Sequence, residues 1–361
     1  MPTPDVPLEK LGFLTIGLFD GDDPGPGMES TLQVVELGEQ LGFDSAYLRH
    51  RHFQTGISSP VAIMAALTQR TSRIAMGTAV TPLGWENPLR MAEDLATVDI
   101  LSGGRLEPGF SVGPPIHWDD VKGALYPDTA DIEDFSYERV SRLLRMIRGE
   151  AVSTFSGPER MEEFSARVEP HAPGLGDRIW YGAGSRRSTQ WAAEQGLNLL
   201  TSNIIKPDRS DHDTDGGWDF AAIQQRQIAL FKQHHPAGDA ARVSQGLVVI
   251  PTDSATPEQR RKYEAYVERR TPRTAEPMGP GLLAAPDVLG TADEIAGRLH
   301  SDAAFREVRE VVFALPFTFE HEDYVQILTD MATELGPALG WSPAAGADAP
   351  VSSTSAAPHS P

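Results

Sequence analysis

Residues 73–110 read RIAMGTAVTPLGWENPLRMAEDLATVDILSGGRLEPGF, in which two apolar runs flank a segment with helical spacing. The runs 73–80 and 105–110 each predict a buried strand. Between them Pro88 begins a helix, because proline is favoured in the first helical turn, and Ser102-Gly103-Gly104 ends it. Three residues of this helix share one face: Met91, Leu95 and Val98. The stretch is therefore one strand–helix–strand unit of an α/β fold.

The same alternation continues toward the N-terminus. Residues 13–18 and 43–48 predict strands, whereas 29–41 and about 60–70 have the spacing of helices. Together with the first stretch, they give four strand–helix units in the first 150 residues or so. Four units are half of a (β/α)8 TIM barrel.

The C-terminal half continues the pattern less regularly. The expected strands are 179–181, 197–201, 243–250 and 311–315, and the expected helices are 186–195, 220–234 and one ending near Leu339. Nearly continuous apolar strands between helices suit a parallel sheet covered by helices. We therefore predict an α/β fold, a (β/α)8 TIM barrel spanning residues 1–341. An open doubly wound sheet with a helical lobe is the alternative, and periodicity does not separate the two.

Two segments depart from the alternation. Residues 251–289 are rich in proline, arginine and glutamate, which predicts an insertion made of a helix and a loop. Residues 342–361 consist largely of alanine, proline, serine and glycine. Such a composition cannot form a core, so we predict a disordered tail there.

Composition limits the functions to consider. The chain has 361 residues, a formal net charge of -20 and no cysteine. The acidic charge argues against nucleic acid as a partner, and the lack of cysteine excludes disulfides, a thiolate nucleophile and cysteine-ligated metals. The start, Met1-Pro2-Thr3-Pro4, lacks the pattern of a secretory signal, and no apolar run has the length of a membrane span. We expect a cytoplasmic protein with no membrane partner.

A turn rich in glycine and serine links the strand at 179–181 to the following helix. It consists of Gly182, Ala183, Gly184, Ser185, Arg186, Arg187 and Ser188. Free N–H groups at a helix start point at an anion, and the helix dipole, the hydroxyls and the guanidiniums add to the attraction. The turn therefore predicts a phosphate site. The alternative is a capped helix with two solvated arginines. A Rossmann fingerprint would need a third glycine where Arg187 stands.

A loop dense in hydrogen-bond donors follows the second strand, with the sequence Arg49-His50-Arg51-His52-Phe53. In a barrel the chemistry occurs at the carboxyl ends of the strands, which is where this loop and the segments 81–88 and 111–115 lie. Imidazoles beside guanidiniums suit a site that stabilises a developing anion or transfers protons. His50, Arg51 and His52 are thus catalytic candidates. The alternative is a basic loop that makes salt bridges.

Metal-ligand residue types occur together at Asp211-His212-Asp213. They lie in a polar stretch rich in glycine and aspartate, which favours a solvated loop. The sequence therefore predicts no metal site.

Two stretches resemble the bacterial luciferase-like family of flavin-dependent monooxygenases. The first runs from Thr71 to Arg105, and the second runs from Trp180 to Gly196, where Ser185, Ser188 and the helix behind them look like the family's phosphate turn. The likeness extends in order from about Phe13 to Leu339. It implies a (β/α)8 barrel with reduced FMN at the carboxyl mouth and the ring against the third and fourth strands. The cofactor-binding residues that it implies there are Ala79, Val80, Gly109 and Ser111, besides the turn from Gly182 to Ser188.

Three further positions follow from the resemblance. The family usually has a cis peptide bond without proline at the position of Ala79-Val80. Its common Glu-His-His-Phe is His50-Arg51-His52-Phe53 here, so Arg51 replaces the first histidine. Val112 stands where an arginine is frequent, and we expect Arg186 and Arg187 to replace that charge.

The function implied by the resemblance is an FMN-dependent monooxygenase that oxygenates a small organic substrate through a flavin C4a-peroxide. Reduced FMN and O2 would be co-substrates, with a separate flavin reductase as supplier, because no nicotinamide-binding domain is visible. The family also implies a homodimer. One alternative is a reductase or dehydrogenase that uses coenzyme F420 on the same barrel. Another is a flavin-binding protein without turnover, in view of the replaced histidine.

Overall fold

The computed structural model describes residues 7–213, 217–279 and 281–344. A parallel sheet lies at its centre, with the strand order β4-β6-β9-β10-β14-β18-β1-β2-β3-β5. Its ten strands are β1 (Lys10–Thr15), β2 (Ser45–Leu48), β3 (Ala75–Thr78), β4 (Thr81–Pro82), β5 (Leu106–Glu107), β6 (Gly109–Ser111), β9 (Trp180–Gly182), β10 (Asn198–Thr201), β14 (Val243–Gln245) and β18 (Glu310–Ala314).

The sheet curls round on itself. Only Ala79 and Val80 separate β3 from β4 in the chain, and only Pro108 separates β5 from β6. The terminal strands of the sheet are β4 and β5. β3 pairs with β5, and β4 pairs with β6. Each terminal strand thus follows or precedes, in the chain, a strand from the opposite end of the sheet. The other neighbours follow chain order, whereas a doubly wound sheet reverses its order at a switch point. The mixed α/β class with a large parallel sheet is confirmed.

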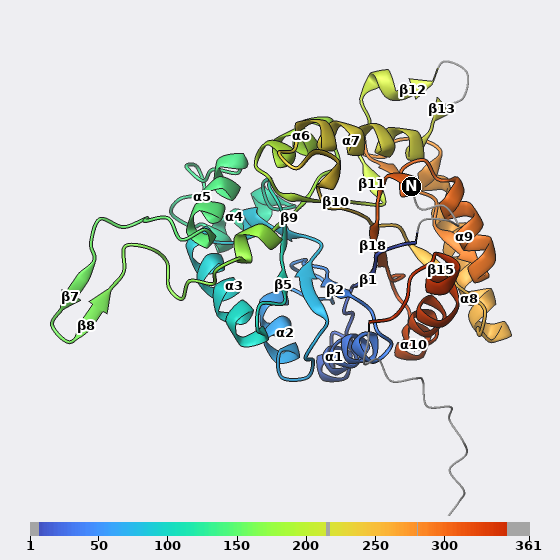
Figure 1. Ribbon diagram of the computed structural model, residues 1–361, viewed down its shortest axis with the longest axis horizontal. Coiled ribbons are helices and arrows are strands. Elements are labelled where there is room, and N and C mark those ends of the chain that lie inside the picture. The colour runs from blue at the N-terminus through green and yellow to red at the C-terminus, as the bar shows by residue number, and fades with distance from the viewer. Residues whose placement is uncertain (1–6, 214–216, 280, 345–361) are drawn as a thin grey trace, which may run out of the picture.

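Helices surround the curled sheet, as Figure 1 shows. They are α1 (Pro24–Gln40), α2 (Pro60–Leu67), α3 (Pro88–Ser102), α4 (Trp118–Leu125), α5 (Tyr137–Ile147), α6 (Arg186–Glu194), α7 (Phe220–His234), α8 (Pro257–Arg270), α9 (Ala292–Ser301), α10 (His321–Asp330) and α11 (Gly336–Ala338). Among the residues that the structure describes, no helix is long and apolar enough to cross a membrane.

The ends of α3 follow from its sequence. The Asn87 side chain accepts hydrogen bonds from the backbone N–H groups of Leu89 (2.9 Å) and Arg90 (3.3 Å), which caps the helix start. Gly103 ends the helix with φ at 74°, a left-handed conformation that glycine adopts readily. α1, in contrast, begins at Pro24 and not at residue 29, because a proline at the first helical position lacks only an N–H that the helix does not use.

The remaining strands form pairs outside the central sheet. They are β7 (Gly157–Glu159) with β8 (Glu162–Phe164), β11 (Ile204–Ile205) with β16 (Leu283–Ala284), β12 (His212–Asp213) with β13 (Gly217–Trp218), and β15 (Val249–Pro251) with β17 (Val288–Gly290). The prediction of one strand over 243–250 is wrong, because β14 ends at Gln245 and β15 pairs with β17. Between them, Val248 still forms a bridge with Ala314 of β18. The region 251–289 does contain a helix, α8.

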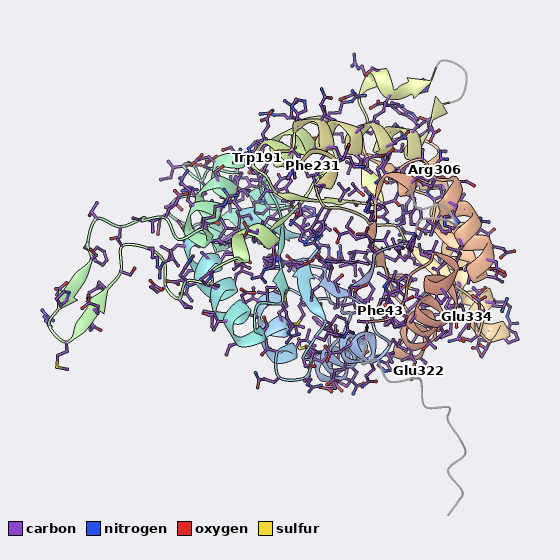
Figure 2. The ribbon with its side chains drawn as sticks, viewed as in Figure 1. Phe43, Trp191, Phe231, Arg306, Glu322 and Glu334 are labelled. Atoms are coloured by element: carbon purple, nitrogen blue, oxygen red, sulfur yellow. The ribbon has the colours of Figure 1, made fainter. Side chains whose placement is uncertain are left out.

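Aromatic packing ties the C-terminal segment to the N-terminal half of the chain. The Phe43 ring meets Phe13 edge-on at 5.2 Å between centroids and lies 5.9 Å from Trp341 (Phe43 is labelled in Figure 2). Trp341 is buried, and its indole N–H donates to Oδ2 of Asp44 over 2.8 Å. Of the tail predicted over 342–361, residues 345–361 lie outside the described residues.

Candidate active site at the carboxyl ends of the strands

A cavity of about 360 Å³ opens where the central strands end. Its walls combine apolar strand residues with the loops that follow them. The lining residues are Leu14, Arg51, Ala79, Val80, Gly182, Ala183, Gly184, Leu200, Thr201, Ser202, Asn203, Ile204, Gly246, Leu282, Val312 and Ala314. Six residues named from the sequence therefore meet in one cavity: Arg51, Ala79, Val80, Gly182, Ala183 and Gly184.

Glycines surround the Val80 side chain at the cavity wall. The peptide bond between Ala79 and Val80 is cis, as the resemblance implied. A Cβ atom on Gly182 would lie 2.8 Å from Cγ1 of Val80, and one on Gly109 would lie 2.4 Å from the carbonyl oxygen of Thr78. Neither position admits a side chain, so backbone forms the wall here. Ser111 ends β6, opposite Pro82 in the ladder.

The turn that leads into α6 is a helix start with a capping box. The Ser185 hydroxyl accepts from the Ser188 N–H (3.3 Å), and the Ser188 hydroxyl accepts from the Ser185 N–H (3.1 Å). Within the described part of the chain, the amides of Gly184, Arg186 and Arg187 donate to no protein acceptor. The helix is therefore capped, as one interpretation of the sequence expected, and its first turn still presents free N–H groups beside the cavity, so the phosphate site stays a prediction.

The two arginines of this turn have different surroundings. Nε of Arg186 lies 3.0 Å from Oδ2 of Asp208, and its Nη2 lies 2.7 Å from Oδ1 of Asp211, so two carboxylates offset its charge. Arg187 is exposed, makes no ion pair among the described residues and lies over the Tyr137 ring at 5.7 Å. Of the two, Arg187 has the more available charge. The Asp211 carboxylate is already held by arginines, Arg186 and Arg226, which leaves little reason for a metal there.

The donor-rich loop splits between two environments. Arg51 lines the cavity, and its guanidinium donates to the His50 carbonyl over 2.9 Å. The rings of His50 and His52 instead converge on Glu86, which follows β4, with Nε2 to Oε1 distances of 3.5 Å and 3.9 Å. His52 also stacks on Trp85, with 4.3 Å between ring centroids.

Burial dominates the protonation of these three groups. It lowers the pKa of His50 to about 3, with His52 adding to the effect, and lowers the pKa of His52, with the charge of Arg51 adding to it. Burial and then the nearby charge of Asp94 raise the pKa of Glu86 to about 7. The imidazoles are therefore neutral at pH 7, and their contacts with Glu86 are not the salt bridges of a basic loop.

Sequence reasoning missed Glu86 as an individual residue, and it missed Arg139 of α5 altogether. Arg139 is buried, and its guanidinium donates to the carbonyl oxygens of Leu83 (2.9 Å) and Glu86 (2.7 Å). It thereby fixes the loop that carries Glu86. Only the helical spacing that places Arg139 on the inner face, beside Val140 and Leu143, could have indicated this role.

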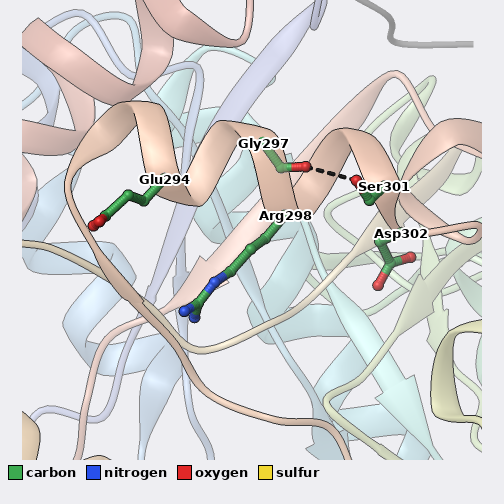
Figure 3. A pocket seen from close by; sticks show the side chains of 5 residues that line it. All are labelled: Glu294, Gly297, Arg298, Ser301 and Asp302. Atoms are coloured by element: carbon green, nitrogen blue, oxygen red, sulfur yellow. Dashed lines mark hydrogen bonds between the residues drawn. The ribbon is translucent and has the colours of Figure 1, made fainter.

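A second hollow lies on α9, far along the chain from these residues (Figure 3). It is lined by Glu294, Gly297, Arg298, Ser301 and Asp302, most of which are exposed. The Ser301 hydroxyl donates to the Gly297 carbonyl over 2.9 Å, so it is used within the helix. Because its lining is mostly exposed, the hollow does not have the features of an active site.

A curled parallel sheet with a cavity at the carboxyl ends of its strands is the arrangement in which many α/β enzymes carry their active sites. Comparison with known proteins specifies the family, since the model of the luciferase-like monooxygenases matches residues 10–304. The chain therefore belongs to the luciferase-like monooxygenase family. The sequence-based assignment to this family of enzymes is confirmed.

Individual members of the family share only part of their sequence with this chain. The alkanal monooxygenase alpha chain of the Kryptophanaron alfredi symbiont is 30% identical over 179 residues, which cover 48% of this chain and 49% of that one. The chain spans about half the length of the curated relatives it matches.

Two solved structures share the fold. The oxygenating constituent of 3,6-diketocamphane monooxygenase from Pseudomonas putida, in complex with FMN, has a TM-score of 0.63, 13% identity and coverage of 92% of this chain and 98% of that one. The coenzyme F420 dependent tetrahydromethanopterin reductase of Methanopyrus kandleri has a TM-score of 0.60, 15% identity and coverage of 92% and 99%.

Proposed function

We propose that the chain is an FMN-dependent monooxygenase that uses reduced flavin and O2 to oxygenate a small organic substrate. The observation that carries the proposal is the position of the cavity between Ala79-Val80 and the start of α6. Leu14, Leu200 and Val312 make its floor apolar, while free amides mark one end. A flat, largely apolar ring with an anionic tail fits such a site.

Named residues would hold each part of the cofactor. The backbone amides of Gly184, Arg186 and Arg187 would bind the phosphate, with Arg187 contributing charge. Because Gly109 and Gly182 carry no side chains, Val80 would contact the face of the flavin ring. Ser111, at the end of β6, completes the wall on that side in this proposal.

Reduced flavin supplies the electrons with which O2 is activated. The chain's own part is to position and shield the reactants. Buried strand ends exclude water from the cavity floor, and the Arg51 guanidinium places a fixed positive charge at its edge, where it stabilises a developing anion. His50 and His52 remain catalytic candidates on the same loop, outside the cavity lining.

Several features expected from the sequence remain proposals. We count β3 with β4, and β5 with β6, as single interrupted strands, and the ladder then becomes the eight-stranded ring of a (β/α)8 barrel. A separate flavin reductase, a homodimer, a cytoplasmic location and the domain boundary at residue 341 rest on the resemblance and on composition.

Cofactor titration is the first test. The purified chain is titrated separately with FMN and with F420, followed by flavin fluorescence, and then supplied with reduced FMN, O2 and a panel of small organic compounds. We expect FMN to bind and one class of compound to gain an oxygen atom. Binding of F420 without FMN would favour the reductase alternative, and O2 consumption that yields only hydrogen peroxide with every compound would favour the protein without turnover.

A further inference from the structure

Three side chains beside the cavity share a gap with no protein hydrogen bond across it. Nε2 of His50 lies 3.5 Å and Nε2 of His52 lies 3.9 Å from Oε1 of Glu86, and the three ligand atoms lie within 4.8 Å of one another. The side chain of His50 is 1% exposed. Neither Nε2 atom has a hydrogen-bond partner among the described residues. Buried polar atoms without partners are rare, so the gap calls for an occupant.

A chain of hydroxyl groups offers a hydrogen-bond acceptor to Nδ1 of His50. The Thr78 hydroxyl donates to the carbonyl of Gly109 (2.8 Å), and the Thr81 hydroxyl donates to Oγ1 of Thr78 (3.1 Å). Oγ1 of Thr81 is then free to accept from Nδ1 of His50, 3.2 Å away. When Nδ1 of His50 donates to Thr81, the lone pair on Nε2 points at the Glu86 carboxylate, and this is the tautomer that a metal ligand needs.

Two facing acceptors need a proton or a metal cation between them. We propose that His50, His52 and Glu86 bind a divalent transition-metal ion of the zinc class, with a further coordination position left for water. Two imidazole nitrogens and one carboxylate oxygen are a ligand set such ions take. Ligands at the usual distance from a tetrahedral zinc ion lie about 3.4 Å apart. Here the two imidazole nitrogens lie 3.5 Å and 3.9 Å from Glu86, and all three ligand atoms lie within 4.8 Å of one another. The Nδ1–H to Thr81 is the outer hydrogen bond that orients a ligating histidine.

The surroundings hold this ligand set in place. Arg139 fixes the backbone of Glu86 through its carbonyl oxygen, and Trp85 stacks on His52. Asp94 adds negative charge near Glu86, whereas Arg51 opposes a cation but directs its guanidinium to the His50 carbonyl. The metal site adds a function to the proposed flavin site and does not depend on it.

Metal binding to the full chain, without flavin, is the direct test. The chelator-treated protein is titrated with Zn²⁺ by calorimetry and with Co²⁺ by visible absorption. We expect one ion per chain and at least tenfold weaker binding in Glu86→Gln and in His52→Asn, a loss of about 1.4 kcal/mol or more. Both side chains are partly exposed, and thermal melting of each metal-free variant verifies that it folds.

The matched control is His117→Asn. Nδ1 of His117 lies 3.9 Å from Asp120, the same distance as the His52 contact with Glu86, but both of those side chains are exposed. This variant should bind the ion like the wild type. No binding by the wild type, or wild-type affinity in both Glu86→Gln and His52→Asn, would overturn the proposal and leave a proton or a water molecule in the gap. FMN titration is a separate measurement, so either result stands without the other.

Discussion

The hydroxyl of Tyr47 donates a hydrogen bond to Oε2 of Glu107 over 2.9 Å inside the curled sheet. The indole of Trp180 donates to the same oxygen over 3.2 Å, and Nη1 of Arg242 donates to Oε1 over 3.0 Å. Nη2 of Arg242 also donates to Oε2 of Glu310 over 2.8 Å. A buried carboxylate is thereby satisfied from β2, from β9 and from Arg242, the residue just before β14, which links these segments through their side chains as well as their backbones.

Glu107→Gln should destabilise the fold, because it removes the charge that Arg242 and Tyr47 surround. Loss of one partner of a buried pair costs roughly 3 kcal/mol or more. Although burial acts to raise the pKa of Glu107, Arg242 and then Tyr47 hold it below its ordinary value of 4.5. Its stabilising effect is therefore present above pH 4.5 and is lost as the pH falls through the folded-state pKa.

Urea unfolding at several pH values measures this effect. The gap in unfolding free energy between wild type and Glu107→Gln should be widest near neutral pH and should narrow below about pH 4.5. Glu162→Gln, at an exposed position in the hairpin of β7 and β8, serves as the control, and its unfolding free energy should match that of the wild type at every pH. A gap that stays constant with pH would mean that the charge of Glu107 contributes nothing.

Trp341→Ala should destabilise the chain by roughly 3–5 kcal/mol, because it empties the space against Phe43 and leaves Asp44 with one donor fewer. Trp341→Phe retains most of the packing and should cost about 1 kcal/mol for the lost hydrogen bond. Chemical denaturation of both variants gives the comparison. Equal losses would show that the hydrogen bond, and not the packing, secures this segment.

Much of the fold could be predicted because strand and helix alternate with clear punctuation. Pro88 and Gly103 marked α3 by local chemistry alone. The interruptions in the strands were not predictable in this way. Residues 105–110 look like one apolar run, but Pro108 has no N–H for the ladder and divides β5 from β6. The run 243–250 is equally apolar, and its division depends on β17, a partner far along the chain.

The local structure around the candidate site was predictable where it lies within one loop. The turn from Gly182 to Ser188 carries its own signal, since glycines and serines precede a helix. Glu86 has no such signal, because a glutamate in a polar loop reads as solvated. Its approach to His50 depends on the pairing of β2 with β3, which brings the ends of distant segments together. Pairing of Arg186 with Asp208 and Asp211 depends in the same way on tertiary structure.

Arg187→Ala should weaken FMN binding by about tenfold, or about 1.4 kcal/mol, because it removes a charge at the phosphate end that no carboxylate offsets. Arg186→Ala should weaken it by less than about threefold, since Asp208 and Asp211 already compensate that guanidinium. Fluorescence titration with FMN measures both. Riboflavin lacks the phosphate, so its affinity should not change in either variant. An equal loss for riboflavin would place Arg187 away from the phosphate.

Arg51→Met should lower the share of consumed O2 that appears as oxygenated product by about tenfold or more, because the cavity then lacks the fixed positive charge that stabilises a developing anion. FMN affinity should change little, since the phosphate lies at the other end of the proposed site. Oxygen uptake, hydrogen peroxide and product are measured together, so that slow turnover is distinguished from uncoupled turnover. Arg90→Gln, on the exposed face of α3, is the control for loss of one arginine. If Arg51→Met kept the wild-type yield of product, the oxygenation step would not depend on Arg51, and the histidines beside it would become the residues to test.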